Sequence, residues 1–264
     1  MTQPAREPKV VKGTPTVAAI YRHPVKSLRG EVVTAAMVTA DGLDGDRAWG
    51  IQDVETGRIL TARREPTLLL AAAMLHDGCA VIELPNGERC TGPGPATDAA
   101  LSSWLGRSVR LVAATDEPPS RAEYFADATD DTSAAIEWTM PAGRFVDALP
   151  MLLLTTASVR KGWSLHPQGH WDVTRFRPNV LIDVDGEGWV EDSWCGRTVH
   201  IGTAVIAPVA PCERCTMVTR PQPSLDRDLN IFKVLARNHG GTLGVWSTVA
   251  APGTISVGDV VQVT

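Results

Sequence analysis

Short apolar runs, separated by turns rich in glycine and aspartate, dominate the hydrophobic pattern of the chain. In the first half they predict strands at residues 17–23, 32–39, 48–53, 58–61, 68–76, 80–84 and 109–113. In the second half they predict strands at 149–154, 180–184, 194–202, 204–209, 243–249 and 254–263. Helical spacing predicts helices at 99–105, from 155 towards 163, and at 225–238. Many short, regularly spaced strands predict a mainly β (α+β) fold built as barrels or sandwiches.

The pattern weakens between residues 116 and 147, where acidic and turn-forming residues gather. This stretch predicts a linker or surface excursion between an N-terminal domain at 15–115 and a C-terminal domain at 148–264. Residues 1–14 lack the apolar segment of a secretory signal, so we expect a disordered tail there.

Composition narrows the function classes. The chain has 264 residues, 44% of them hydrophobic, and a formal net charge of -5, which argues against a general nucleic-acid binder. No apolar run approaches the ~20 residues needed to span a membrane. The five cysteines are odd in number and scattered, so they do not suggest a disulfide framework. We therefore expect a protein of the reducing cytoplasm.

One pair of cysteines, Cys212 and Cys215, is spaced to act on a single atom at the expected exit of a strand. Thiolate sulfur is a soft ligand for soft or redox-active metals, and the adjacent Arg214 favours the thiolate. A closed zinc site would need two more ligands, for which Cys195 and His200 are candidates. A dithiol redox pair normally opens a helix, whereas this context is strand-rich. A buried inert pair is the third alternative.

Several polar residues near predicted strand ends could bind an anion. Lys26 and Ser27 follow a His-Pro-Val segment, Arg47 lies in a Gly/Asp turn, and Arg177 precedes a strand. Taken singly, each is most simply a surface or turn residue, and Ser158 is most simply a helix cap. Together they are the components of an anion cradle. The chain has no Walker phosphate loop, Gly-x-Gly-x-x-Gly, Gly-x-Ser-x-Gly or His-Glu-x-x-His motif.

Five sequence blocks occur in a fixed order. They are His-Pro-Val-Lys-Ser-Leu at 23–28, Gly-Leu-Asp-Gly-Asp-Arg at 42–47, Phe-Arg-Pro-Asn at 176–179, Pro-Cys-Glu-Arg-Cys at 211–215 and Pro-Gly-Thr-Ile-Ser-Val-Gly-Asp at 252–259. In this order, over residues 16–264, the chain resembles the molybdenum cofactor sulfurase C-terminal (MOSC) domain family. The resemblance implies a MOSC β-barrel, an N-terminal β-barrel companion domain carrying the first two blocks, and a few short helices.

The resemblance also implies a molybdenum cofactor, Mo-molybdopterin. Members similar to the mitochondrial amidoxime-reducing component bind molybdenum through the pterin dithiolene and one cysteine. By its position in the motif, that metal ligand and catalytic residue would be Cys215, with Cys212 as an accessory residue. The residues that would hold the pterin and its phosphate are Lys26, Ser27, Arg47, Ser158, Arg177, Asn179 and Arg214.

The implied activity is that of a pyridoxal-phosphate-independent oxidoreductase, which reduces N-hydroxylated compounds by removing oxygen at the metal. Because the chain ends at Thr264 without a ferredoxin-like segment, we expect a separate electron donor of the flavin reductase, ferredoxin or cytochrome type. The alternative is a carrier that delivers the cofactor, or sulfur held as a persulfide on Cys215, without turnover. One departure is the Thr219-Arg220-Pro221 segment, where relatives often carry an acidic residue, and it bears on substrate preference.

Overall fold

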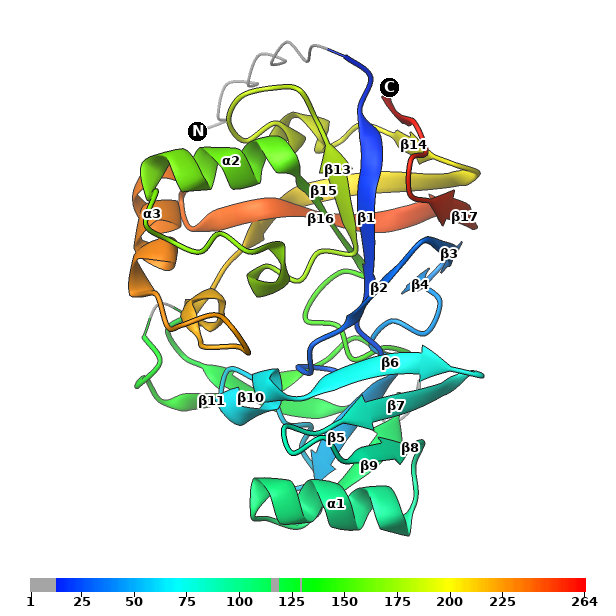
Figure 1. Cartoon of the computed structure of the whole chain (residues 1–264), viewed down its shortest axis with the longest axis vertical. Coiled ribbons are helices and arrows are strands. Elements are labelled where there is room, and N and C mark those ends of the chain that lie inside the picture. Colours follow the sequence, from blue (N-terminus) through cyan, green and yellow to red (C-terminus); the bar gives the residue numbers. More distant parts are fainter. Residues whose placement is uncertain (1–12, 115–118, 129) are drawn as a thin grey trace.

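Strands from the second half of the chain form one large sheet, which the first strand of the chain joins (Figure 1). The computed structural model describes residues 13–114, 119–128 and 130–264. Within them, eight strands follow the order β18-β14-β15-β16-β12-β13-β1-β2. In that order their bounds are Val261–Val263, Val199–Ile201, Ala204–Glu213, Thr242–Ala251, Met151–Thr155, Val180–Asp183, Thr16–Arg22 and Glu31–Val33.

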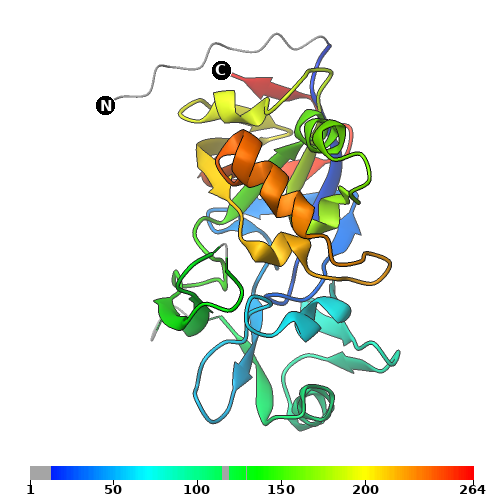
Figure 2. The ribbon, with the colours of Figure 1, turned by 90° about the vertical axis from the view of Figure 1, so that its left-hand side faces the viewer.

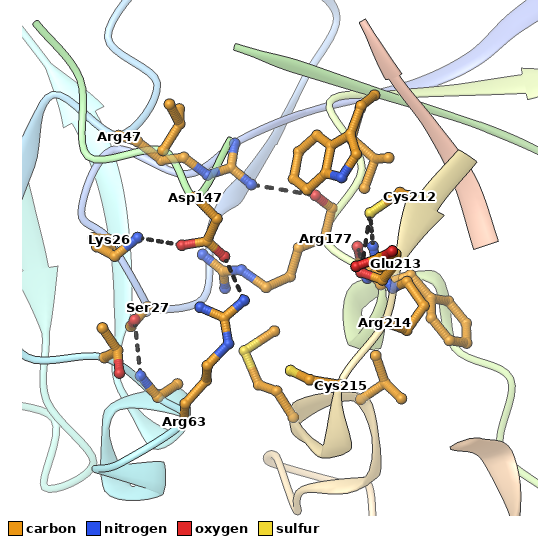
Figure 3. A pocket seen from close by; sticks show the side chains of 18 of the residues that line it. Lys26, Ser27, Arg47, Arg63, Asp147, Arg177, Cys212, Glu213, Arg214 and Cys215 are labelled. Atoms are coloured by element: carbon orange, nitrogen blue, oxygen red, sulfur yellow. Dashed lines mark hydrogen bonds and ion pairs between the residues drawn. The ribbon is translucent and has the colours of Figure 1, made fainter. Parts of the chain in front are cut away.

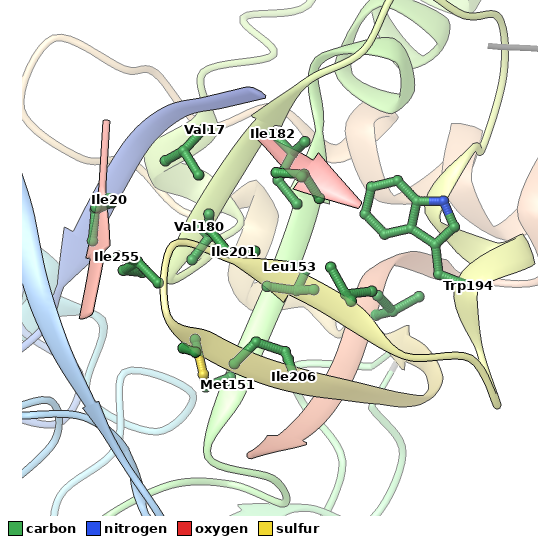
Figure 4. Packing of buried hydrophobic residues seen from close by; sticks show 14 of the residues in the cluster. Val17, Ile20, Met151, Leu153, Val180, Ile182, Trp194, Ile201, Ile206 and Ile255 are labelled. Atoms are coloured by element: carbon green, nitrogen blue, oxygen red, sulfur yellow. The ribbon is translucent and has the colours of Figure 1, made fainter. Parts of the chain in front are cut away.

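This sheet curls so that the segment before β18, at one end of the strand order, contacts β1, which lies next to the other end. Thr16 in β1 bridges Val260, just before β18, and the Val17 N–H donates to the Asp259 carbonyl at 2.9 Å. Within the described residues, the strand order by itself does not form a closed ring. Figure 4 shows the apolar side chains that fill the interior, among them Val17, Leu153, Ile182 and Ile206. The large sheet therefore encloses its own core, as a barrel does.

One parallel pair interrupts the antiparallel pattern. β12 and β13 run parallel, with Leu153 opposite Val180, and α2 (Thr156–Leu165) connects them, because parallel neighbours need a long crossover. All five residues of β12 are buried, which is typical of a strand covered on both faces. A second apolar cluster joins this sheet to α3 (Leu229–His239) through Leu154, Leu181 and Ile231. The helices therefore cover one face of the sheet (Figure 1).

The middle of the first half forms a separate group of small sheets, drawn below the large one in Figure 1. Its strands are β5 (Trp49–Asp53), which pairs with β9 (Val109–Ala113), and the three-stranded sheet of β6 (Ala72–His76), β7 (Cys79–Glu83) and β8 (Arg89–Thr91). At its far end, α1 (Pro95–Leu105) stops at Gly106 in the left-handed conformation. This group has its own core, which includes Val25, Leu68, Ile82 and Leu101.

Two further pairings lie near the junction of the two groups. β3 (Ala35–Thr39) pairs with β17 (Gly253–Ser256) from the end of the chain and with β4 (Gly42–Leu43). β10 (Arg121–Phe125) and β11 (Ala135–Thr139) form an antiparallel hairpin. Figure 2 shows this hairpin at the level where the two groups meet. Short 3₁₀ helices complete the fold, at Pro66–Leu70 (η1), Val173–Arg175 (η2), Glu191–Trp194 (η3) and Thr216–Thr219 (η4).

Some predicted elements were wrong in their bounds. The single strand at 32–39 breaks into β2 and β3, and the strand at 194–202 shortens to β14 because Trp194 ends η3. The helix predicted at 225–238 begins at Leu229, since the Asp228 side chain caps it by accepting from the Asn230 N–H. Leu229 is itself 45% exposed, so the buried face of α3 lies on Ile231, Phe232, Leu235 and His239.

The division into 15–115, 116–147 and 148–264 stays a prediction, and strand pairing crosses it. β1 and β3 pair with strands beyond residue 148, and the 116–147 segment contains β10 and β11. Residues 1–12 of the predicted tail lie outside the described residues. In the part of the chain that the structure describes, no helix has the length and apolar character to cross a membrane.

Candidate functional site

Charged side chains from both halves of the chain surround a cavity of ≈ 70 Å³, here called the inner cavity (Figure 3). Its polar lining is Lys26, Ser27, Arg47, Thr61, Arg63, Asp147, Arg177, Cys212, Glu213, Arg214 and Cys215. Five cationic side chains thus line the cavity with two carboxylates, Asp147 and Glu213. This imbalance favours an anionic ligand.

Two turns after β1 place the first cations of the inner cavity. The Lys26 N–H donates to the Trp49 carbonyl at 2.8 Å, and the Arg47 N–H donates to the His23 carbonyl at 2.7 Å. The Asp46 carboxylate accepts from the His23 N–H at 2.6 Å and pairs with the Arg47 guanidinium. These bonds fasten the two turns together, so that both cationic side chains reach the inner cavity.

The backbone of the inner cavity is strained. Among the described residues, five non-glycine residues have positive φ, and three of them line this cavity: Ser27 at 70°, Arg47 at 49° and Arg177 at 53°. A left-handed conformation at a non-glycine residue costs about 1–3 kcal/mol and persists only where the surroundings enforce it. Such strain clusters at functional sites, so its coincidence with the cations supports a binding role.

Asp147 is the centre of a network on one side of the inner cavity. Its carboxylate accepts from the Lys26 ammonium at 2.6 Å and the Arg63 guanidinium at 3.1 Å (Figure 3). It also accepts from the Tyr124 hydroxyl at 2.7 Å. Burial alone would raise the pKa of Asp147, but Arg63 and Lys26 outweigh it and hold that pKa well below its usual range. Asp147 is therefore a fixed anion, and it orients Lys26 and Arg63.

The surroundings of Arg177 disfavour its positive charge. Its guanidinium is 8% exposed and donates to the Leu28 carbonyl at 2.6 Å. Burial, and then the repulsion of Arg47, lower the pKa of Arg177 to about 9. Burial and the same two arginines lower the pKa of His23, which stays neutral behind them. A bound anion would relieve this repulsion, so the charge of the cavity favours a negatively charged ligand.

The two cysteines differ in their surroundings. Cys212, inside β15, is fully buried, and its sulfur accepts from the Arg214 guanidinium at 2.9 Å. Burial raises the pKa of Cys212, although Arg214 opposes the shift. Cys215 lies immediately before η4 and interacts with the Arg63 guanidinium. Burial lowers the pKa of Arg63, but Asp147 and then Cys215 outweigh it and raise that pKa. Cys215 also lines a second opening, which Cys212 does not.

That second opening, here called the outer hollow, has a volume of ≈ 680 Å³. It shares Arg63, Asp147, Glu213, Arg214, Cys215 and Trp246 with the inner cavity. Its remaining wall is Tyr124, Phe125, Ala128, Ile136, Trp138, Ala148, Phe232, Ala236, Gly240 and Gly241. The Cys215 sulfur therefore lies between a small cationic cavity and a larger aromatic one.

Two protein-family models together match most of the chain. The MOSC N-terminal beta barrel domain matches residues 14–130, and the MOSC domain matches residues 142–262. The chain belongs to the MOSC family. This membership confirms the predicted family and its mainly β fold with an N-terminal companion domain.

Three relatives show what this MOSC chain is similar to. It is 32% identical over 233 residues to mitochondrial amidoxime-reducing component 1 of Mus musculus, covering 77% of this chain and 65% of the relative. It is 28% identical over 304 residues to mitochondrial amidoxime-reducing component 1 of Homo sapiens, covering 97% and 85%. It is 24% identical over 269 residues to molybdenum cofactor sulfurase of Homo sapiens, covering 86% and 29%. The MOSC chain thus spans 65% of the mouse protein's length and 29% of the sulfurase's.

The structure brings together most, but not all, of the site residues predicted for this MOSC chain. Those that line the inner cavity are Lys26, Ser27, Arg47, Arg177, Cys212, Arg214 and Cys215. Ser158 is buried in the first turn of α2, where its hydroxyl bonds Glu191 at 2.6 Å. Asn179 accepts from the Leu152 N–H at 3.0 Å and joins neighbouring strands. Neither of these two lines the cavity, so the geometry gives no support to a contact between them and a cofactor.

Sequence reasoning missed Arg63 and Asp147. Arg63 belongs to one of the two adjacent basic pairs in the chain, and that was its only signal. Asp147 stands just before the buried run of β12 and had no signal of its own. Their ion pair joins positions 84 residues apart, so it exists only in the folded chain.

The other interpretations of the cysteine pair can be weighed against the same geometry. No group of three or more potential metal-ligating side chains gathers anywhere in the described ranges, so those residues contain no closed zinc site. All five cysteines are free thiols. Both cysteines of the pair are buried, and only Cys215 lines the outer hollow. In the segment that departs from relatives, Arg220 pairs with Asp131 at 2.9 Å and lines neither opening.

Proposed function

We propose that this chain is a molybdenum-cofactor-dependent oxidoreductase that reduces N-hydroxylated compounds, with Cys215 as the protein ligand of the metal. One observation carries the proposal: Cys215 lines both the inner cavity, with its five cationic side chains, and the more apolar outer hollow. The amidoxime-reducing relatives support the reaction class.

The chemistry of the inner cavity fits a phosphorylated pterin that chelates a soft metal. Arg47, Arg177 and Lys26 would bind the phosphate through charge-assisted hydrogen bonds. The Arg214 Nε atom is buried and has no hydrogen-bond partner within the described residues, so it is free to donate to a ligand. The Cys215 thiolate would bind the metal. When bound, this cofactor supplies oxygen-atom acceptance and a two-electron redox change.

The residues around Cys215 define how protons can reach the reaction. Asp147 stays ionised and is occupied by Lys26, Arg63 and Tyr124, so it does not donate a proton at neutral pH. Burial, and then Asp147, raise the pKa of Tyr124, so its hydroxyl keeps its proton. The two protons that turn the abstracted oxygen into water would therefore arrive from solvent through the outer hollow. The Arg63 guanidinium also interacts with the Cys215 side chain.

Electrons would come from a separate donor protein of the flavin reductase, ferredoxin or cytochrome type. We place the enzyme in the cytoplasm, where five free thiols would persist.

The test is to purify the protein from a host that makes the cofactor and to measure molybdenum per chain. We expect about one metal atom per chain in the wild type and none in Cys215→Ala, with turnover of an N-hydroxylated amidine lost in parallel. Full metal content and full activity in Cys215→Ala would rule the assignment out.

A carrier without turnover is the second candidate, favoured by the similarity of 86% of the chain to molybdenum cofactor sulfurase. It would hold the cofactor, or a persulfide on Cys215, for delivery. A chemical reductant and an N-hydroxylated substrate separate the two functions. Repeated turnover supports the reductase, whereas stoichiometric release of cofactor or sulfur without turnover supports the carrier.

A further inference from the structure

The β10–β11 hairpin has one charged face and one apolar face. Its register places Glu123 opposite Glu137 and Tyr124 opposite Ile136, with Trp138 two positions after Ile136 on the same side. Because side chains alternate along a strand, these pairs point to opposite faces. Tyr124, Ile136 and Trp138 all line the outer hollow.

The charged face fixes the hairpin to the N-terminal group of sheets. Arg58 donates to Glu123 at 2.6 Å and to Glu137 at 3.0 Å. The backbone adds an Ile59 N–H donation to the Arg121 carbonyl at 2.8 Å. The far end of the hairpin bonds to the turn that carries Cys215, because the Thr216 N–H donates to the Ala128 carbonyl at 3.1 Å. The hairpin is thus held at both ends, and its apolar face is directed at the hollow next to Cys215.

The apolar face has room for a ligand. Trp138 is 44% exposed and Ile136 is 43% exposed, although both line a concave wall. Trp138 meets the edge of Tyr124 at a centroid distance of 5.9 Å, and Arg63 covers the face of Tyr124 at 4.0 Å. The tyrosine ring is therefore occupied, whereas the tryptophan keeps nearly half of its surface open. A hollow of ≈ 680 Å³ also has the size of a small-molecule site.

We infer that Trp138 determines substrate specificity, by stacking on a flat, uncharged aromatic group that the outer hollow accepts. This inference rests on the proposed function, because the N-hydroxylated end of the same substrate would have to reach Cys215. Among the described residues, four charged ones line the hollow, namely Arg63, Arg214, Asp147 and Glu213. Because two are cationic and two are anionic, and Arg63 pairs with Asp147, the described lining of the hollow has no surplus charge that would attract a charged substituent. Such a substituent would also have to lose its hydration beside an apolar wall.

Kinetics with two neutral N-hydroxylated amidines of different size test the inference. N-hydroxybenzamidine carries a phenyl group where N-hydroxyacetamidine carries a methyl group. Trp138→Ala should raise KM for the phenyl compound roughly fivefold to tenfold, since aromatic contacts are worth about one decade of affinity or less. It should leave kcat, and KM for the methyl compound, within about twofold of the wild type.

Two control variants make the result specific. Trp138→Phe keeps a ring at the position and should preserve the preference for the phenyl compound. Trp163→Ala removes another tryptophan that is 55% exposed but lies on α2, outside both openings, and should change nothing. Equal effects of Trp138→Ala on both compounds, or no effect on either, would overturn the inference.

A binding measurement separates this inference from the proposed function. In saturation-transfer NMR, the ring protons of unreactive benzamide should receive magnetisation from the wild type and from Trp163→Ala, and lose most of it with Trp138→Ala. If benzamide contacts Trp138 but molybdenum is absent, the proposed function fails, whereas the binding of an aromatic group at Trp138 is supported. If metal and turnover depend on Cys215 but Trp138→Ala changes neither benzamide contact nor the phenyl preference, only the inference about Trp138 fails.

Discussion

The inner cavity and the outer hollow share the Cys215 sulfur, yet they are built in different ways. The inner cavity is small, ≈ 70 Å³, and two of its cations, Arg47 and Arg177, stand on strained backbone. The outer hollow is ≈ 680 Å³, and its wall is largely apolar. Tight retention of one ligand calls for fixed charge, whereas exchange of another calls for an apolar surface that solvent can reach. The contrast supports the proposed division between a retained cofactor and an exchanging substrate.

The largest expected effect comes from the cysteine between them. Cys215→Ser should lower activity more than about a hundredfold, because even residues behind a metal ligand contribute roughly tenfold to a hundredfold. Cys212→Ser should be much milder, since its sulfur already bonds Arg214 inside the protein. Molybdenum per chain and turnover rate, measured side by side, check this order. The reverse order would make Cys212 the ligand.

Removing a cation should affect the inner cavity alone. Arg177→Ala and Arg47→Ala should each weaken cofactor retention roughly tenfold to a hundredfold, because a charge-assisted hydrogen bond contributes about 1.5–3 kcal/mol. Metal content after extended dialysis measures the loss. Arg89→Ala, at an arginine with 64% of its side chain exposed, is the matched control and should retain the metal. Trp138→Ala should retain the metal as well. Loss of metal from Trp138→Ala would show that the outer hollow also contributes to cofactor retention.

Asp147, which lines both openings, should make the free energy of unfolding depend on pH. The pKa of Asp147 is lower in the folded protein than in the unfolded chain, so its contribution to stability is present above about pH 4 and is lost as the pH falls further. Asp147→Asn should therefore lower the free energy of unfolding at pH 7, and by progressively less as the pH falls below about 4. With 33% of the side chain exposed, we expect a difference of about 1–2 kcal/mol, between the values of surface and buried pairs.

Denaturant titrations of the wild type and Asp147→Asn from pH 7 down to pH 2 would reveal the convergence. A constant difference across this range would mean that Asp147 acts through packing rather than through its charge.

The smallest effect should come from an ion pair at the turn of the β10–β11 hairpin. Arg227 pairs with Asp131 in this turn at 2.9 Å, but 48% of the Arg227 side chain is exposed. Arg227→Ala should change the free energy of unfolding by less than about 1 kcal/mol, because exposed ion pairs contribute little. KM for both amidines should stay within about twofold. A larger change in KM, measured with the same two compounds, would show that this pair shapes the hollow.

The sequence predicted those parts of the molecule whose signal is local. The apolar run of β12, the glycine stops of α1 and α3 at Gly106 and Gly240, and the spacing of Cys212 and Cys215 all lie within a few neighbouring positions. The alternation of charged and apolar residues in the β10–β11 hairpin was hidden by the acidic turns around it, so the hairpin was taken for a linker.

The rest of the site depends on contacts between distant residues. Lys26 meets Asp147 across 121 positions, and no pattern within the chain marks the pair. Ser158 shows the converse: its place at a helix start suggested a ligand contact, but the folded chain directs its hydroxyl to Glu191. Local pattern identified the cations, and only the fold shows which carboxylate holds them.

The pairing of β1 with β13 bears on how the protein is made. β1 is synthesised long before its partner β13, which begins only at Val180, and Cys215 and Trp246 follow later still. No nascent fragment that stops before β16 can enclose the site. If the proposed function holds, the cofactor would therefore enter only after the ribosome has passed β16.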